Sequence, residues 1–288
     1  MLKIALPNKG RLAVETRELF EDAGLDIRVS SERSLLASLG GEFQALFVRA
    51  QDIPVFVADG AADVGVTGHD LVCESECPLE TRIDLGFGRC RLVVAAREDS
   101  GILALDDLAE FPRVATSFPR LTRRFFEGRS ARVDIVPVSG ATEIAPHLGI
   151  ADIVVDLTST GSTLRVNGLR EIATVLESTA QLVTAPDAFP AGSDKARALD
   201  ELVAAVTSVL RARGKRYLMA NVPRAALEQV KRILPGLNGP TVVDILNGGA
   251  FVAVHAVVQA NAIYRTIAEL KTQGAEGILV TRIERLMP

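Results

Sequence analysis

The chain has 288 residues, of which 48% are hydrophobic and 24% charged, and its net charge at pH 7 is −4. This composition is typical of a soluble globular protein, and the length predicts two or three domains. The absence of Trp and the presence of only two Tyr argue against a single-stranded nucleic-acid surface, which needs aromatic platforms. We find no signal-peptide layout and no apolar run of membrane-spanning length, so we expect a cytoplasmic protein with no nucleic-acid or membrane partner.

Predicted strands and short helices alternate in the first third of the chain, which indicates an α/β sheet covered on both faces. Strands are expected at residues 2–6, 43–48, 63–67, 83–87 and 91–96, and helices at 12–23 and 53–59. Polar turns follow these strands, and α/β sheets place their ligands at the carboxyl ends of strands. In the first turn, Lys9 and Arg11 flank Gly10 and are either anion contacts or ordinary surface charges.

The strand–helix pattern restarts after residue 96. Further strands are predicted at 113–116, 133–136 and 153–155, and helices after Pro119 and from Gly140. The first of these helices and its exit carry Arg120, Arg123, Arg124, Arg129 and Arg132. We interpret these arginines as a solvated helix face rather than a nucleic-acid contact.

The stretch at residues 151–164, ADIVVDLTSTGSTL, carries the clearest functional signal. Its apolar run is short enough for a strand buried on both faces, bracketed by Asp152 and Asp156. A hydroxyl- and glycine-rich turn follows, made of Thr158, Ser159, Thr160, Gly161, Ser162 and Thr163. Such a turn directs several backbone N–H groups into one concavity that suits a phosphate. Ordinary Ser/Thr capping gives a similar composition, but the density of hydroxyl groups favours the phosphate site.

Two strands and one long helix follow the loop. We expect the strands, at 170–177 and 181–184, to return toward the first lobe, and the helix to run over 193–213 with one apolar face. The sequence therefore predicts two α/β lobes with a cleft between them. Lobe I comprises residues 1–90 and 180–213, and lobe II comprises residues 91–179.

The remainder, 214–288, is predicted to be a separate domain of order βαββαβ, the ferredoxin-like unit. Its strands are expected at 217–222, 241–246, 250–258 and 277–283, and its helices at 223–234 and 261–273. Asn247, Gly248 and Gly249 are the predicted hairpin turn. The domain has no catalytic constellation, which favours a role in binding or assembly.

Seven motifs together resemble the ATP phosphoribosyltransferase family of histidine biosynthesis, in its long, hexamer-forming version. They are PNKGRL at 7–12, DIP at 52–54, DVGVTGHD at 63–70, GFGRCRL at 86–92, ATSFPRL at 115–121, GATEIAP at 140–146 and ADIVVDLTSTGSTLRVNGL at 151–169. The resemblance covers essentially the whole chain. The stretch DLTSTGSTL is close to the family's phosphoribosyl-pyrophosphate signature, whereas PNKGRL alone is a weak motif.

The resemblance implies an enzyme in which N1 of the ATP adenine attacks C1 of phosphoribosyl pyrophosphate, with Mg²⁺ as cofactor and pyrophosphate as the leaving group. It implies two lobes like those of periplasmic binding proteins, followed by a regulatory domain through which histidine inhibits the enzyme. It also implies a homo-oligomer, from dimer to hexamer.

The resemblance also assigns roles to residues. The donor's 5-phosphate would lie in the loop of Thr158, Ser159, Thr160, Gly161, Ser162 and Thr163. Asp152 or Asp156 would face the ribose hydroxyls or the metal, although Asp152 is equally a water-exposed strand-start residue. Lys9 and Arg11 would lie near pyrophosphate or the ATP phosphates.

The remaining assignments concern ATP and histidine. Arg49, Asp70 and Phe118 are the candidates around ATP, where Phe118 is either an apolar wall for adenine or a core residue. The catalytic set is Lys9, Arg11, Arg49 and Asp156, and the protein ligands of Mg²⁺ are not assigned. Asn221, Thr241 and Gly277 match the histidine site, or alternatively serve only turns and strand ends.

Two other functions remain open from the sequence. One is a two-lobed, non-catalytic protein that binds a small anion, although a simple solute binder has no need of a hydroxyl-dense loop beside Lys9 and Arg11. The other is a phosphoribosyltransferase that acts on a free base rather than on ATP.

Overall fold

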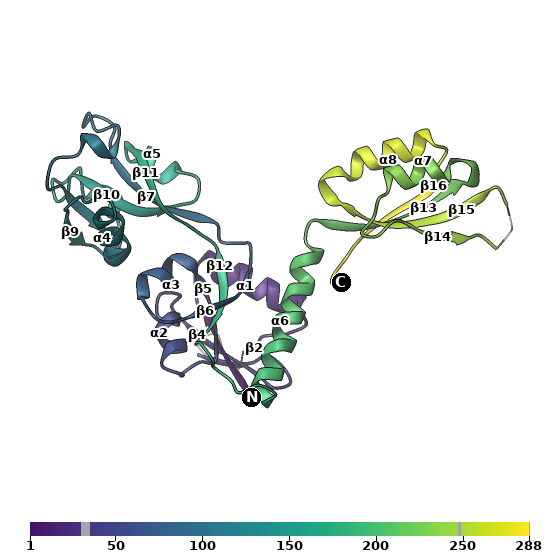
Figure 1. The fold of residues 1–288 in the computed structure, drawn as a ribbon, viewed down its shortest axis with the longest axis horizontal. Helices are drawn as coiled ribbons and strands as arrows, with labels where there is room; N and C mark the ends of the chain where they lie inside the picture. The colour runs from purple at the N-terminus through teal and green to yellow at the C-terminus, as the bar shows by residue number, and fades with distance from the viewer. Residues whose placement is uncertain (30–34, 247–248, 288) are drawn as a thin grey trace. The chain divides into compact units, whose positions relative to one another are not determined.

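The computed structural model describes residues 1–29, 35–246 and 249–287. The chain forms two compact units, Met1–Val203 and Ala204–Pro288, and the course of the chain through each is drawn in Figure 1. The division falls inside the long helix α6 (Asp194–Ala212), whereas the sequence predicts the last domain from residue 214. None of the described helices has the length and apolar character needed to cross a membrane.

The first sheet of the first unit contains seven strands among the described residues, in the order β2-β3-β4-β1-β5-β12-β6. Their bounds are β1 (Leu2–Pro7), β2 (Arg28–Val29), β3 (Leu36–Ser38), β4 (Phe43–Val48), β5 (Val64–Gly68), β6 (Glu80–Asp84) and β12 (Ala180–Thr184). Strand β1 is parallel to both β4 and β5, and β12 is antiparallel to both β5 and β6. The parallel centre brings the turns after β1, β4 and β5 to one edge of the sheet.

The second sheet has the order β11-β7-β10-β8-β9 over the described residues. Its strands are β7 (Cys90–Arg97), β8 (Arg113–Thr116), β9 (Asp134–Pro137), β10 (Ile153–Thr158) and β11 (Leu169–Ser178). The chain enters this sheet after β6 and leaves it between β11 and β12. The two α/β sheets are the two predicted lobes, and the chain crosses between them twice.

Helices cover both sheets. They are α1 (Arg11–Asp22), α2 (Ile53–Ala58), α3 (His69–Ser75), α4 (Pro119–Glu127), α5 (Ser162–Val166) and α6, with the 3₁₀ turns η1 (Leu105–Asp107) and η2 (Thr142–Ile144). Pro54 lies in the first turn of α2 and Pro119 in that of α4, where proline is favoured because its missing N–H would have no helical partner.

Several elements differ from the prediction. The segment 83–87 is not one strand: β6 ends at Asp84, and Gly86 and Gly88 have φ angles of +71° and +65°, which no strand accommodates. Strand β11 pairs with β7 in the second sheet, so only β12 returns to the first lobe. The helix expected from Gly140 is only the short turn η2, and the short strands β2 and β3 were not predicted.

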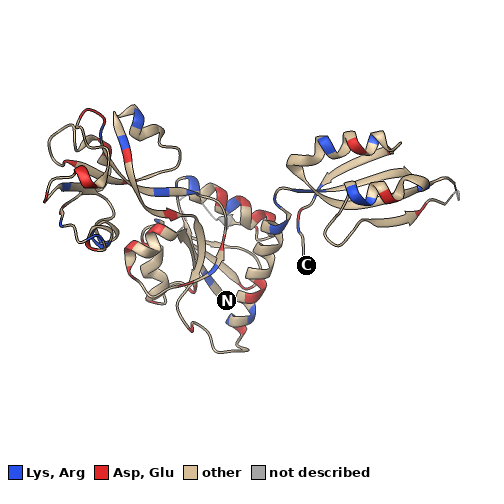
Figure 2. Ribbon diagram, turned by 45° about the horizontal axis from the view of Figure 1, so that its top comes forward, with Lys and Arg blue, Asp and Glu red and all other residues tan. Residues whose placement is uncertain are grey.

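The second unit has the predicted ferredoxin-like order and an antiparallel sheet, β14-β15-β13-β16. Its elements are β13 (Lys215–Pro223), η3 (Arg224–Ala226), α7 (Leu227–Ile233), β14 (Thr241–Asp244), β15 (Phe251–Gln259), η4 (Ala260–Ala262), α8 (Ile263–Thr272) and β16 (Glu276–Arg282). One core lies between the sheet and its helices, and residues of both charge signs lie along α7 and α8 (Figure 2). Of the predicted hairpin turn, Asn247 and Gly248 lie outside the described residues.

Candidate active site

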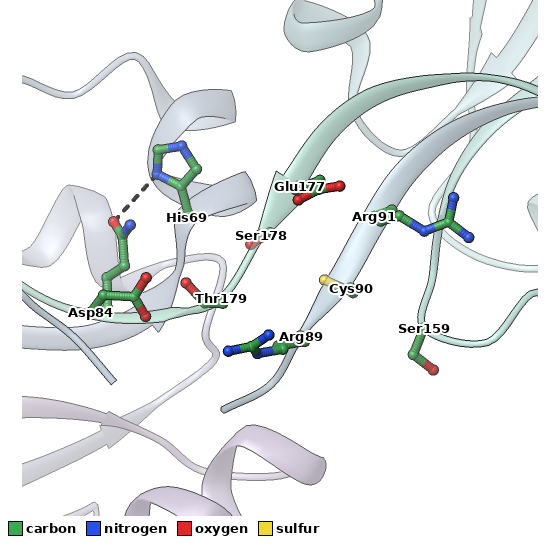
Figure 3. A pocket seen from close by; sticks show the side chains of 10 residues that line it. His69, Asp84, Arg89, Cys90, Arg91, Ser159, Glu177, Ser178 and Thr179 are labelled. Atoms are coloured by element: carbon green, nitrogen blue, oxygen red, sulfur yellow. Dashed lines mark hydrogen bonds between the residues drawn. The ribbon is translucent and has the colours of Figure 1, made fainter. Parts of the chain in front are cut away.

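A polar cavity of about 440 Å³ lies in the first unit, where the chain crosses between the two sheets. It is lined by His69, Asp84, Arg89, Cys90, Arg91, Ser159, Glu177, Ser178, Thr179 and Gln181. In Figure 3, His69 and Asp84 lie on one side of the crossing strands, and Arg91 and Ser159 on the other. Both sheets therefore contribute to the wall of the same cavity.

The predicted phosphate loop enters this cavity through Ser159. Strand β10 continues to Thr158, whose buried Oγ1 accepts the Gly161 N–H at 2.8 Å and so folds the turn. Gly161 has a φ angle of +74°, a conformation that glycine adopts without steric cost. The Thr160 Oγ1 and Ser162 Oγ atoms lie 2.9 Å apart on the exposed side of the turn.

The loop has donors to offer an anion. Ser159, Thr160, Ser162 and Thr163 are all exposed. Within the described residues, the N–H groups of Thr160 and Thr163 have no hydrogen-bond acceptor. Since buried or ligand-facing N–H groups are normally paired, these free donors and the neighbouring hydroxyls form a cradle that an oxyanion would complete.

An ion pair lies beneath this loop. The Arg91 guanidinium contacts both Glu171 carboxylate oxygens, with Nη1–Oε2 at 2.9 Å and Nη2–Oε1 at 3.2 Å. A Cβ atom at Gly161 would lie only 2.8 Å from Glu171 Oε1. Glycine is therefore favoured here by its backbone conformation, and any other residue would also displace the Glu171 carboxylate. Arg91 brings positive charge to the cavity wall next to Ser159.

The two aspartates that bracket the strand have different environments. Asp152 is at the start of β10, at the opposite end from the loop, and its Oδ2 accepts the Arg113 N–H at 2.7 Å. Of the two roles expected for Asp152, a contact with ribose or the metal and an exposed residue at a strand start, this position favours the second. Asp156 is half-buried on β10, and burial raises its pKa, with a smaller contribution in the same direction from the Glu143 carboxylate. The Leu157 N–H, which donates to Asp156 Oδ1 at 2.8 Å, and Thr142 act in the opposite direction on this pKa.

Asp70 is buried at the start of α3 and is held by the crossing strand. The Ser178 hydroxyl donates to Asp70 Oδ1 at 2.5 Å, and the Asp70 N–H donates to Ser178 Oγ at 3.0 Å. Burial raises the pKa of the Asp70 carboxyl. The neighbouring His69, which we did not predict as a site residue, faces the cavity, with Nδ1 3.3 Å from Gln181 Oε1.

The predicted cations lie at the edge of the first sheet. Lys9 and Arg11 follow β1, Arg49 follows β4, and all three are exposed. Pro7 pairs with Val48 across the parallel strands, so the two turns are neighbours. The Arg11 Nε lies 3.3 Å from Glu15 Oε1. These cations are close to one another, but none of them lines the cavity described above.

Phe118 is a core residue in the structure. Its side chain is only 5% exposed and packs in the apolar cluster of the second sheet with Leu121 and Phe125. A side chain with so little exposed surface offers little area on which an adenine ring could stack. The expectation of an apolar wall for ATP at Phe118 is therefore corrected in favour of the core alternative.

The three candidates for the histidine site separate into two groups. Asn221 on β13 and Gly277 on β16 are neighbours, because a Cβ atom at Gly277 would lie 3.2 Å from Asn221 Nδ2. Thr241 is on β14, at the opposite edge of the sheet. One copy of the domain therefore brings only Asn221 and Gly277 together.

Most of the cavity-lining residues were missed by the sequence interpretation. Arg89, Cys90, Glu177 and Ser178 lie where strands cross between sheets, and no local pattern marks such a crossing. The motif GFGRCRL at 86–92 was the available signal. Among the residues that the structure describes, no group of three or more His, Cys, Asp or Glu could hold a metal ion.

Comparison with known proteins shows which family the chain resembles. The sequence model described as ATP phosphoribosyltransferase matches residues 49–208, and the model described as HisG, C-terminal domain, matches residues 212–285. An ATP phosphoribosyltransferase of Gemmatimonas aurantiaca is 68% identical over the full length of both chains. One from Natronomonas pharaonis is 49% identical, also over the full length of both.

A solved structure agrees with these sequence relatives. The chain resembles a chain of the ATP phosphoribosyl transferase (HisG:HisZ) complex from Thermotoga maritima, with a TM-score of 0.63 and 30% identity. The match covers 72% of this chain and 99% of that one. These relatives favour the enzyme over a non-catalytic protein that binds small anions.

Proposed function

The chain belongs to the ATP phosphoribosyltransferase family, and we propose that the cavity at the crossing of its two sheets is where it transfers phosphoribosyl to ATP. One observation carries this assignment: Ser159 of the hydroxyl-rich loop 158–163 lines the cavity beside Arg91, and the next residues of the loop, Thr160 and Gly161, line an adjoining pocket that also includes Arg91. The donor's 5-phosphate would accept hydrogen bonds from the N–H groups of this loop and from its exposed hydroxyls.

The transfer needs little acid–base catalysis. The N1 lone pair of adenine forms the new bond to C1 of the ribose, while the C1–O bond breaks and its electron pair leaves with pyrophosphate. Positive charge develops at C1 and negative charge on the leaving oxygen. Positioning and charge stabilisation therefore contribute most of the rate enhancement. Arg89 supplies positive charge at the cavity wall, together with Arg91, whose charge is partly balanced by its ion pair with Glu171.

Lys9, Arg11 and Arg49 form a second group of cations, at the edge of the first sheet. Because the turns after β1 and β4 are neighbours, these three side chains could bind one polyphosphate, which we assign to ATP or to departing pyrophosphate. Asp70 would support the ATP side through α3 rather than by direct contact, since its carboxylate is already bonded to Ser178.

A Mg²⁺ ion would neutralise the pyrophosphate and make it a better leaving group. Mg²⁺ prefers oxygen ligands and binds through one or two carboxylates together with substrate phosphates. Asp156 and the nearby Glu143 are suitable carboxylates, and they could equally accept hydrogen bonds from the ribose hydroxyls. The phosphates themselves would supply the remaining ligands.

Pyrophosphate release from ATP, phosphoribosyl pyrophosphate and Mg²⁺ tests the assignment. We expect release that requires all three, and no release when adenine replaces ATP, which separates this function from transfer to a free base. Thr160→Val removes one hydroxyl of the loop and should raise the KM for the donor more than the KM for ATP. An unchanged donor KM in a folded Thr160→Val protein would contradict the loop's role.

We assign residues 214–288 to regulation and assembly, with histidine as the inhibitor and a homo-oligomer, dimer to hexamer, as the working form. The separate core of this unit supports its independence, and the contact between Asn221 and Gly277 supports a small effector site on that side of the sheet. We also assign the enzyme to the cytoplasm.

Truncation before Gly214 tests the regulatory assignment. The shortened chain should lose histidine inhibition and assembly, while part of the transferase activity remains because the cavity lies wholly in residues 69–181. The measurements are histidine inhibition curves and the molar mass of each protein in solution. Equal inhibition of the full and shortened chains would exclude the last domain as the effector site.

A further inference from the structure

Helix α3 extends from the cavity to the second sheet, although the chain enters it from the first. Its first turn carries His69, which lines the cavity, and Asp70, which is bonded to Ser178 of β11. Farther along the helix, Leu71 and Cys73 pack against the apolar core of the second sheet. A change at the end of α3 can therefore alter the cavity wall at its beginning.

The end of α3 caps helix α4 of the second sheet. The two Glu74 carboxylate oxygens accept the N–H groups of Arg120 at 3.0 Å and Leu121 at 2.9 Å. These N–H groups belong to the first turn of α4, where a helix lacks internal acceptors. The residue before α4 is Phe118, whose side chain has no acceptor atom. Glu74 therefore supplies a cap that the local sequence cannot supply.

Arg120 in turn caps the carboxyl end of α3. Its Nη1 donates to the carbonyl oxygens of Glu74 at 3.1 Å and Ser75 at 3.0 Å, which are among the last carbonyls of α3. Glu76 ends the helix at a φ angle of +57° and pairs with Arg124 at 2.8 Å and with Arg120 at 3.5 Å. The Glu76 pairs are half-exposed and contribute little, so the two backbone caps carry the junction.

We propose that Glu74 and Arg120 are positioning residues that join α3 to α4 by reciprocal capping and thereby hold the cavity wall at His69 and Asp70 against the wall at Glu177 and Ser178. Neither residue touches the cavity. The proposal goes beyond the assignment of the active site, and only its kinetic test rests on that assignment.

The junction can be tested directly by hydrogen exchange in the full chain. Glu74→Gln keeps the side-chain volume but removes one carboxylate acceptor, and Arg120→Met keeps the aliphatic stem but removes the donors. Arg123→Met is the matched control, because Arg123 is an exposed arginine on the same helix. The amides of Arg120 and Leu121 should exchange about tenfold faster in Glu74→Gln, as expected for loss of a hydrogen bond to a charged group. They should be unchanged in the control.

The kinetic test separates positioning from simple stabilisation. Glu74→Gln and Arg120→Met should each raise the KM of at least one substrate about tenfold, a change that one charge-assisted hydrogen bond can produce, while kcat stays near that of the parent enzyme. The double variant should resemble the worse single variant, because the two residues act in one junction. Arg123→Met should have parent KM values.

Two results would overturn the proposal. In the first, both variants lower the unfolding midpoint but leave both KM values at the parent level, so that the junction serves stability alone. In the second, the effects of the two substitutions add fully in the double variant, so that the residues act independently. If the parent protein has no transferase activity, the exchange measurement still tests the junction, because unchanged amide exchange in Glu74→Gln would refute it.

Discussion

Strands β10 and β15 differ in how the rest of the molecule covers them. In β10, Ile153, Val154 and Val155 are all fully buried, and they divide between two apolar clusters, one on each face of the sheet. In β15, the buried residues alternate with half-buried ones, and the buried set belongs to one cluster. The sheet that contains β10 is therefore covered on both faces. The sheet that contains β15 is covered by the described helices on one face only.

These burial patterns show where each unit derives its stability. A continuous apolar run reflects a sheet between two layers, and a period-two pattern reflects a sheet with one open face. On the open face, Met219 pairs with His255 on β15 and with Leu279 on β16. The Tyr217 hydroxyl lies 2.9 Å from His255 Nδ1 on that face. On this face Leu279 is 61% exposed, whereas Val154 in the second sheet is fully buried.

The largest expected effect comes from a charge placed in each sheet. Val154→Asp introduces an unpaired carboxylate between two layers and should destabilise the first unit by more than about 4 kcal/mol. Leu279→Asp introduces the same group on the open face and should cost the second unit less than about 1 kcal/mol. Urea unfolding measures both, and equal costs would remove the distinction between the two sheets.

The two units can be followed separately in this experiment. The chain has no Trp, and its two Tyr are Tyr217 and Tyr264, both in the second unit. Tyrosine fluorescence therefore reports on the second unit, while far-UV circular dichroism reports on both. In Val154→Asp, the dichroism signal should decrease while the tyrosine transition remains.

Substitution of one glycine in each unit is expected to have a smaller and more local effect than the buried charge. Gly161 and Gly277 have φ angles of +74° and +58°, and alanine in such a conformation costs about 1–2 kcal/mol. Gly161→Ala would also press against Glu171 beneath the phosphate loop, and should raise the donor KM about tenfold or more. Gly277→Ala would press against Asn221, and should weaken histidine inhibition while the substrate KM values stay unchanged.

Steady-state kinetics with and without histidine measures both variants. Each glycine variant serves as the control for the other, because both carry the same backbone strain. A donor KM that rises equally in Gly277→Ala would mean that the effect is general destabilisation rather than a local change at the loop.

The smallest expected effect is a difference in pH dependence. Burial raises the pKa of Asp70 in the first unit, whereas the exposed Lys231 ion pair lowers the pKa of Glu228 in the second. A carboxyl with a raised pKa binds its proton more tightly in the folded than in the unfolded protein, so its contribution to stability declines as pH rises from the unfolded value of about 3.9 through the folded value. A carboxyl with a lowered pKa stabilises above its unfolded value and loses that contribution as pH falls.

Asp70→Asn tests the sign of this effect. The amide keeps an acceptor for Ser178 but cannot ionise, so the variant should gain stability relative to the parent as pH rises from about 4 toward 7. The measurement is urea unfolding of the first unit across this range. A difference that stays constant with pH, or that has the opposite sign, would show that Asp70 is ionised at no cost in the folded protein.

The sequence predicted what local patterns control. Residues 43–48 and 113–116 are strands with the predicted bounds, because apolar runs ended by turn residues mark buried strands directly. The hydroxyl-rich turn after β10 was also visible, because its hydroxyl residues and Gly161 are consecutive in the sequence. Two roles remained open for Asp152, because spacing along a strand does not reveal that its two ends face opposite edges of the sheet.

Other features depend on contacts between distant segments. Ser178 meets Asp70 across 108 positions of the chain, and Glu74 caps α4 across 46 positions. No sequence window contains both partners of such a pair. Phe118 was ambiguous for the same reason, since an apolar side chain beside a polar turn serves a core or a ligand equally well until the neighbouring helix is known.

The two crossings between the sheets have a consequence for the modular construction of the chain. Everything from β7 to β11 is an insertion into the fold of the first sheet, and the inserted segment enters and leaves through paired strands, with Cys90 opposite Ser178. Paired residues of antiparallel strands lie about 5 Å apart, so the host sheet is interrupted at one point only. By chain connectivity alone, the lobe that carries the hydroxyl-rich loop is therefore a cassette with its boundaries at that pair, although an exchanged lobe must keep the contacts between α3 and α4.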